Sequence, residues 1–319
     1  MSRMAFAAST AMLFTFYGQA RVAYCERNLP REPGTVSGGY LRSDLQSLVT
    51  TSHTNGMQFT IKNIGHSTNG RAILSVTAEF RQHIEKIHTV LFICRQHGHE
   101  PASTSGALMF LGDLATEPED SELFHEMKDV RVVVVPVANP DGAAAFLRHN
   151  AKNVDLNRDW LKRKEPETKA LWHLILETRP DIVVDQHELY PNDTRSDFTE
   201  TAALGSGISP ELAHRCALLQ NSVDQRMAHQ GFPVTEHWIT DHHPARLAHR
   251  YASVVLHIPS ILFETNRNEH IVRPLQVRAN VHRTFMEAVV RYASGSGSAL
   301  DAVQDRTSNL TLPVQRTKL

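Results

Sequence analysis

Short polar segments follow four apolar segments of this chain, and together they carry most of the side chains that could do chemistry. They are "RQHGHE" after residues 89–94, "NPDG" and "RHNAKNVDLNRD" after 130–138, "QHE" after 181–185, and "TNRN" after 260–264. If the apolar segments are neighbouring strands of one sheet, the polar segments meet at one edge of that sheet. The side chains brought together in this way would be those of His97, Glu100, Arg148, Arg158, His187 and Glu264.

The residue types in this set favour a metal-dependent hydrolase. Two imidazoles and one carboxylate, with a fourth position left open, form a hydrolytic zinc site. His97 and Glu100 lie three residues apart, a spacing that brings two side chains to one face, whereas His99 is adjacent to Glu100 and would point away from it. The sequence contains no HExxH, which excludes a thermolysin-type helix. We therefore predict that His97 and Glu100, and not His99, are metal ligands.

Hydrophobic periodicity predicts the elements that position these side chains. Short apolar or alternating segments predict strands at 57–64, 72–80, 89–94, 130–138, 181–185 and 260–264. Helical spacing of apolar residues predicts helices at 103–114, 165–180, 209–231 and 281–292. This alternation predicts an α/β protein with a mixed, largely parallel central sheet and helices on both faces.

The composition is that of an ordinary globular protein. Lysine and arginine number 33 against 34 acidic residues, for a formal charge of -1, so we expect no nucleic-acid partner. The three cysteines form no CxxC pair, which argues against a thiolate metal site and a disulfide framework.

The two ends of the chain differ from its middle. Arg3, the apolar segment 4–16 and the small residues that follow resemble a secretory signal peptide, and the 13 residues of that segment are fewer than the about 20 that span a bilayer. We expect a signal peptide at 1–20, a linker at 21–39, one catalytic domain at 40–293 and a disordered tail at 294–319. A signal peptide would place the protein in the periplasm or outside the cell, whereas a native N-terminal helix would leave it in the cytoplasm.

The motifs, taken in order, resemble the zinc metallocarboxypeptidases of the carboxypeptidase A and B family, and most closely its shorter bacterial members. They are "HGHE" (97–100), "NPDG" (139–142), "DLNRDW" (155–160), a lone histidine after a strand and "ILFET" (261–265), while "IGHSTNGRAI" (64–73) resembles the segment before the family's metal site. The resemblance covers residues 40–293. It implies the fold of that family and hydrolysis of the C-terminal amide bond of peptides.

The resemblance also implies roles for the residues at the predicted sheet edge. His97, Glu100 and His187 would hold one Zn²⁺ ion. Glu264 would act as the general base that takes a proton from the attacking zinc-bound water. Arg148 would stabilise the oxyanion of the tetrahedral intermediate.

Substrate binding is the part of the resemblance with the weakest match. Asn157 and Arg158 would bind the terminal carboxylate of a peptide or small amide substrate, because a guanidinium meets a carboxylate with two parallel hydrogen bonds. Tyr251 is a candidate for the family's substrate-capping tyrosine, although it lies close to Glu264 in sequence. Arg246, His249 and Arg250 could favour an acidic substrate side chain or could be solvated.

Alternatives remain at both the residue and the protein level. His187 could be a core histidine, and Arg158 could pair structurally with Asp155 or Asp159. A zinc amidohydrolase of N-acyl amino acids, similar to aspartoacylase and succinylglutamate desuccinylase, shares several of these motifs. Those enzymes carry a β-rich segment after the base, where this sequence predicts one helix and a tail. A third alternative is a catalytically silent peptide-binding module.

Overall fold

The computed structural model describes residues 45–46, 56–80, 87–116, 118, 120–241, 245–267 and 273–295 of the 319-residue chain. The expected signal peptide (1–20), the expected linker (21–39) and residues 296–319 of the expected tail (294–319) lie outside these residues, whereas residues 294 and 295 belong to the last helix. Among the described helices, none combines the length and the apolar composition needed to cross a bilayer.

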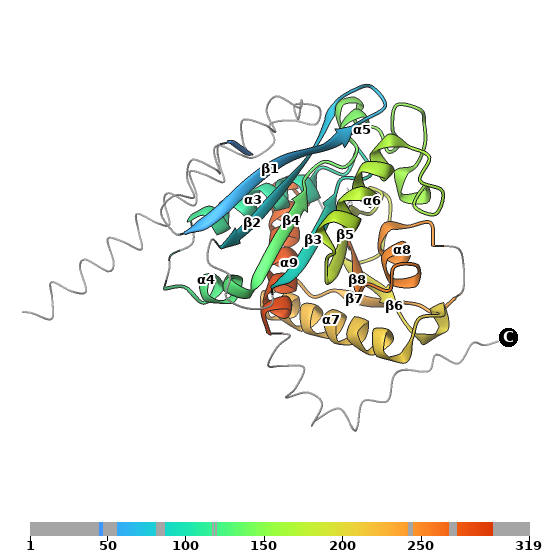
Figure 1. Ribbon diagram of the computed structural model, residues 1–319. Helices are drawn as coiled ribbons and strands as arrows, with labels where there is room; N and C mark the ends of the chain where they lie inside the picture. The colour runs from blue at the N-terminus through green and yellow to red at the C-terminus, as the bar shows by residue number, and fades with distance from the viewer. Residues whose placement is uncertain are drawn as a thin grey trace, which may run out of the picture.

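One mixed eight-stranded sheet forms the centre of the molecule, with the strand order β1-β2-β4-β3-β5-β8-β6-β7 (Figure 1). Its strands are β1 (Met57–His66), β2 (Ala72–Phe80), β3 (His88–Cys94), β4 (Val130–Val135), β5 (Ile182–Glu188), β6 (Phe198–Ala202), β7 (Thr235–Ile239) and β8 (Ser260–Thr265). The four central strands β4, β3, β5 and β8 are mutually parallel, whereas β1, β2 and β6 join the sheet in antiparallel pairs. The predicted α/β fold with a mixed, largely parallel sheet is confirmed.

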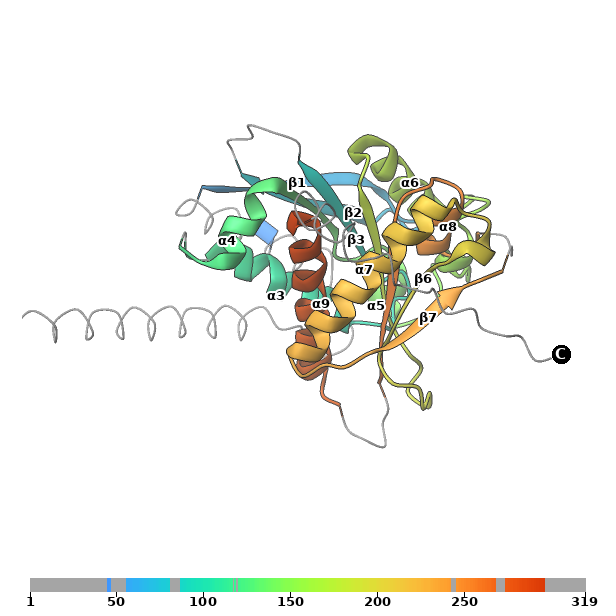
Figure 2. The same ribbon diagram turned by 90° about the horizontal axis from the view of Figure 1, so that it is seen from below.

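Helices cover both faces of this sheet. They are α3 (Ala102–Thr116), α4 (Glu122–Glu126), α5 (Pro140–Ala145), α6 (Pro166–Thr178), α7 (Pro210–His229), α8 (Ala248–Val254) and α9 (Leu275–Gly295). One face packs against α3, α9 and α7, and Figure 2 shows α9 between the other two. The opposite face packs against α6 and α8. Because β-strand side chains alternate between faces, consecutive residues of one strand serve different cores.

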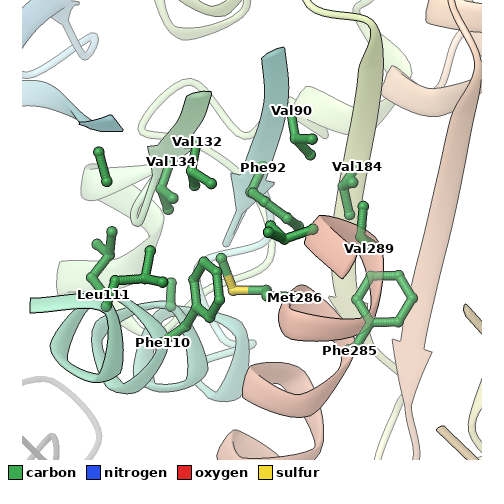
Figure 3. Close-up of a cluster of buried hydrophobic side chains, with 14 of the residues drawn as sticks. Val90, Phe92, Phe110, Leu111, Val132, Val134, Val184, Phe285, Met286 and Val289 are labelled. Carbon is green, nitrogen blue, oxygen red and sulfur yellow. The ribbon is translucent and has the colours of Figure 1, made fainter. Parts of the chain in front are cut away.

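The larger core lies between the sheet and α3 and α9 (Figure 3). Val90 and Phe92 of β3 point into it, whereas Leu91 and Ile93 point into the core under α6 and α8. Fully burying one such side chain stabilises the fold by about 1.5–3 kcal/mol. Gly106 lets α3 approach α9 closely, since a Cβ atom there would lie 2.5 Å from the Cβ of His282.

The turn between β1 and β2 is fastened to the start of α5. Asp141 of the "NPDG" segment accepts hydrogen bonds from Ser67 Oγ (2.9 Å), from the Asn69 amide (2.9 Å) and from Arg71 Nη1 (2.7 Å). Asn139 caps α5 by accepting from the Gly142 amide at 2.8 Å. The segments "IGHSTNGRAI" and "NPDG", which contribute no reactive group, are therefore bound to each other. Together they stabilise the start of α5, which leads into the loop that carries Arg148.

Predicted boundaries differ from the observed ones at a few points. The segment 130–138 is a strand only to Val135, and the last helix begins at Leu275 where 281 was expected. The sequence patterns did not predict β6, β7 or α8.

Candidate metal centre

Three buried side chains meet where β3 and β5 end. His97 and Glu100 lie in the loop between β3 and α3, and His187 is the sixth residue of β5. His97 Nδ1 lies 2.7 Å from Glu100 Oε1, and His187 Nδ1 lies 2.8 Å from Glu100 Oε2. The two Nδ1 atoms are 3.1 Å apart. The structure thus brings the three residues into one cluster in which each offers a ligand atom to the same point.

The outer nitrogens of both imidazoles face carboxylates. His97 Nε2 lies 3.0 Å from Asp155 Oδ1, and His187 Nε2 lies 2.8 Å from Asp185 Oδ1. Since an ionised carboxylate can only accept, each Nε2 carries a proton and donates it outward. Carboxylates in this position fix the orientation of metal-binding histidines. The lone pairs of both Nδ1 atoms then converge with the Glu100 carboxylate, an arrangement that requires positive charge at its centre.

The electrostatics of the cluster also call for a cation. Burial alone would raise the pKa of Glu100, but the two adjacent imidazoles hold it well below its usual range. Burial alone would lower the pKa of His97 and His187, but the surrounding carboxylates outweigh burial and raise both. Without a metal ion, protons would therefore supply the positive charge. Two nitrogens, one carboxylate and an open position suit Zn²⁺, and binding it would release those protons.

The loop that carries two of the ligands depends on a glycine. A Cβ atom on Gly98 would lie 1.9 Å from the backbone carbon of Gly142, so the loop can pack against α5 only with glycine at this position. Arg95 adopts φ +56° and donates from Nε to the Gly98 carbonyl at 2.9 Å. The "HGHE" and "NPDG" segments, far apart in sequence, are therefore in direct backbone contact.

Arg148 lies beside the cluster. It donates from Nε and Nη2 to Asp155 Oδ2 at 3.0 and 2.8 Å, and its Nη1 is 3.7 Å from Glu100 Oε1. Its guanidinium stacks over the ring of Tyr190 at 5.4 Å. Asp155 therefore contacts both a metal ligand and the predicted oxyanion-binding arginine.

Glu264 lies on the strand next to His187. The two residues are directly paired in the parallel register of β5 and β8, so their side chains leave the same face of the sheet. Burial raises the pKa of Glu264 to about 7, with Glu100 and Asp185 adding to the effect and the two histidines opposing it. A carboxyl group of this kind holds or releases a proton near neutral pH.

The two residues predicted to bind the substrate carboxylate, Asn157 and Arg158, lie in different environments. Arg158 is exposed, and its Nη1 donates to the neighbouring Asn157 carbonyl at 2.8 Å. Asn157 is buried, and its amide is used within the protein: Nδ2 donates to Asp185 Oδ2 at 3.2 Å, and Oδ1 accepts from the Ala248 amide at 2.8 Å. The structure therefore keeps Arg158 accessible and directs Asn157 towards the residues that support His187.

Tyr251 is not brought to the metal cluster. Its side chain is buried in the core under α6 and α8, next to Trp160, and its hydroxyl accepts from Arg163 Nη1 at 2.6 Å. The expected contact of Tyr251 with substrate thus has no support in its position, because α8 turns this residue towards the core.

A different tyrosine lies at the site. Tyr190 follows β5, is 49% exposed, and contacts both Arg148 and the ring of His99. The sequence could have indicated Tyr190, because it lies only three residues after His187 and therefore at the same edge of the sheet. The supporting role of Asp155 was also not predicted.

Comparison with known proteins agrees with this geometry. Residues 45–190 match the family model for zinc carboxypeptidase, a segment that contains all three metal ligands but not Glu264. Carboxypeptidase 2 of Trichophyton rubrum is 39% identical over 92 residues, which is 29% of this chain and 17% of that protein. Carboxypeptidase SOL1 of Arabidopsis thaliana is 26% identical over 180 residues, covering 52% of this chain and 36% of that protein. The matched segments thus cover well under half of either curated relative.

Solved structures share the fold. A metallo-carboxypeptidase from Burkholderia cenocepacia superposes with a TM-score of 0.69 at 20% identity, covering 80% of this chain and 69% of that one. A metallo-carboxypeptidase from Pseudomonas aeruginosa, in complex with (2-guanidinoethylmercapto)succinic acid, gives 0.62 at 21% identity, covering 80% and 68% of the two chains. The cluster of His97, Glu100 and His187 matches the zinc site of this family. The matched segment, the fold and the ligand set agree, and over residues 45–190 the chain is similar to the zinc carboxypeptidase family.

Proposed function

We propose that this protein is a zinc-dependent carboxypeptidase that hydrolyses the C-terminal amide bond of peptides. One observation carries the proposal: the three metal ligands, Glu264 and Arg148 are adjacent at one edge of the sheet. Glu264 is paired in register with His187, and Arg148 Nη1 lies 3.7 Å from Glu100 Oε1. A ligand set, a base and a cationic donor are the groups that metal-assisted amide hydrolysis needs.

Glu264 is the proposed base. A bound zinc ion would act as a Lewis acid and lower the pKa of water at the open position. The Glu264 carboxylate would accept a proton from the attacking water and deliver it to the departing amine. Its pKa of about 7, raised by burial, suits a group that must both accept and return a proton near neutral pH.

Arg148 is the proposed donor to the developing oxyanion. Two of its nitrogens are held by Asp155, and its guanidinium rests on Tyr190, so the group is oriented before substrate arrives. A donor oriented in advance stabilises negative charge in the transition state without reorganisation.

Arg158 is the proposed anchor for the terminal carboxylate of the substrate. Its guanidinium is exposed, and a planar guanidinium binds a carboxylate through two parallel hydrogen bonds. We assign Asn157 to the support of Asp185, on the basis of the hydrogen bond from its Nδ2 to Asp185 Oδ2. The proposed substrate is therefore a peptide, or a small amide, with a free carboxylate.

A direct test offers the zinc-loaded protein a mixture of peptides with free C-termini, the same peptides amidated, and N-acyl amino acids. Mass spectrometry of the products should show loss of single C-terminal residues from the free peptides only. Cleavage of N-acyl amino acids alone would replace the proposal with the amidohydrolase. Saturable peptide binding without any cleavage would support the silent binding module.

Export of the protein is a separate proposal, since residues 1–20 lie outside the described structure. It rests on the basic start and short apolar segment of the sequence. N-terminal sequencing of the protein recovered from the periplasm or medium should begin near residue 21. A mature protein that retains Met1 or Ser2 in the cytoplasm would contradict it.

A further inference from the structure

A chain of hydrogen-bonded side chains runs from His187 in the metal cluster to the partly exposed Glu200. It lies on the face of the sheet that packs against α8. His187 Nε2 lies 2.8 Å from Asp185 Oδ1. The other oxygen of Asp185 is 3.4 Å from His249 Nδ1, and His249 Nε2 is 3.0 Å from Glu200 Oε1. Asp185 and His249 are completely buried, and Glu200 is partly exposed. No step of the proposed hydrolysis uses His249 or Glu200.

The position of His249 is fixed by its backbone as well as by its side chain. It is the second residue of α8, and its carbonyl accepts a hydrogen bond of 2.6 Å from Ser260 Oγ of β8. The preceding residue, Ala248, donates its amide to Asn157 Oδ1 at 2.8 Å. The imidazole is therefore held between Asp185 and Glu200 by the elements on both sides of it.

The His249 ring carries charge between two carboxylates. Each ring nitrogen faces a carboxylate oxygen, so each nitrogen must donate, which makes the ring an imidazolium. Burial lowers the pKa of His249, but the hydrogen bonds that the ring donates to Asp185 and Glu200 outweigh burial and raise the pKa above the ordinary value. The positive ring compensates the buried charge of Asp185, which otherwise faces only neutral donors and His187.

The orientation of the Asp185 carboxylate is fixed by four contacts, two at each oxygen. Oδ1 accepts from Gln96 Nε2 at 2.6 Å and from His187, while Oδ2 accepts from Asn157 at 3.2 Å and from His249. A carboxylate held in this way presents Oδ1 to His187 Nε2 in one orientation. Because Nε2 is occupied, the His187 lone pair on Nδ1 must face His97 and Glu100.

We propose that His249 is a positioning residue of the metal centre, which acts through Asp185 to hold His187 in its metal-binding orientation, with Glu200 as its outer anchor. The inference rests on the metal site of the proposed function, but it concerns metal affinity and needs no substrate. A chain that binds zinc in this way and cleaves no peptide would overturn the proposed function and leave this inference intact.

The protein contains a matched control for this role. His282 of α9 is also completely buried, and its Nδ1 lies 2.7 Å from Gln186 Oε1, next to His187 in sequence. Its Nε2 lies 3.1 Å from Thr265 Oγ1. Gln186 leaves the opposite face of β5, so His282 supports the same strand without reaching the metal cluster. Losing either imidazole removes two hydrogen bonds, but only the His249 imidazole is connected to a metal ligand, through Asp185.

The test measures the zinc affinity of the full-length wild type, His249→Gln and His282→Gln by competition with a chromogenic chelator. We expect His249→Gln to bind zinc about tenfold more weakly, at the lower end of the effect of removing an outer partner of a metal ligand, and His282→Gln to stay within about twofold of wild type. The visible absorption of the Co²⁺-substituted protein should change in His249→Gln alone. Equal losses in both variants would reduce His249 to a packing residue, and unchanged affinity in His249→Gln would also overturn the proposal.

Glu200→Gln keeps the test decisive if His249→Gln does not fold. Glu200 is partly exposed, so its replacement should leave the melting temperature nearly unchanged. We expect it to weaken zinc binding about threefold, since it acts one contact further from the metal ligand. A folded Glu200→Gln protein with wild-type zinc affinity would overturn the proposal.

Discussion

Asp155 joins the metal ligand His97 to Arg148, and its replacement by asparagine is the sharpest test of how the site is built. Asp155 accepts from His97 Nε2 at 3.0 Å and from Arg148 Nε and Nη2 at 3.0 and 2.8 Å. The Asp155→Asn side chain would be neutral and would keep only one acceptor oxygen. Its amide group would face either the imidazole N–H or the guanidinium, where another donor is unfavourable.

The size of the effect follows from the contacts that are lost. A hydrogen bond to a charged group contributes about 1.5–3 kcal/mol, which corresponds to about a 10- to 150-fold change in an equilibrium constant. Asparagine can still accept one of the bonds, so we expect the lower part of that range, about 10- to 30-fold weaker zinc binding. Hydrolysis should fall further than zinc affinity, because Arg148 loses its orientation as well.

Zinc affinity should be measured by chelator competition and turnover at saturating zinc. Asp193→Asn is the control, since Asp193 also accepts from the Nε and Nη2 of an arginine, Arg195, at 2.7–3.2 Å, but is partly exposed and contacts no metal ligand. The control should bind zinc like wild type. If Asp155→Asn also binds zinc like wild type, the assigned orientation of His97 is wrong.

Three further predictions address the base, the substrate anchor and stability. Glu264→Gln should retain zinc and lose hydrolysis by at least about 100-fold, because the proton acceptor is gone; turnover near wild type would remove Glu264 from its proposed role. Arg158→Ala should slow hydrolysis of peptides with a free C-terminus, with KM rising at least about tenfold, and equal losses on amidated analogues would contradict the anchor. Burial raises the pKa of the Asp224 carboxyl from 3.8 to about 7, so the folded state binds this proton more tightly than the unfolded state does. The contribution of Asp224 to the free energy of unfolding therefore falls as pH rises from about 4 to 7. Asp224→Asn should therefore be more stable than wild type at pH 8, by at most about 4 kcal/mol in the free energy of unfolding, with the difference shrinking towards pH 4 in urea titrations. A pH-independent difference would contradict the raised pKa.

Local sequence patterns predicted the central part of the fold because that part is defined by local chemistry. The segments at 89–94 and 181–185 are short apolar runs, as expected of strands with both faces covered, and both are strands of the parallel centre. Strand β6, which lies between β8 and the edge strand β7, was not predicted because "FTETA" is short and more than half polar. Its threonines bond partners distant in sequence, such as Thr199 with Asp224 and Thr201 with the Ser260 carbonyl, which no local pattern reveals.

The metal ligands could be predicted for a related reason. His97 and Glu100 are close in sequence, and His187 ends a strand whose neighbours follow from the fold class. Contacts between distant loops could not be predicted, because they depend on the direction of individual side chains. Tyr251 points into the core from α8 although it lies near Glu264 in sequence, while Tyr190 reaches Arg148. His249, only two positions from Tyr251, is turned by the same helix towards Asp185.

X-ray absorption at the zinc edge of the zinc-loaded full-length protein, compared with His187→Ala, would show directly which residues bind the metal. We expect one zinc ion per chain, with two imidazole nitrogens and oxygen ligands at about 2.0–2.2 Å, and one imidazole fewer in the variant. A wild-type spectrum with no histidine scattering, or an unchanged imidazole count in His187→Ala, would contradict it.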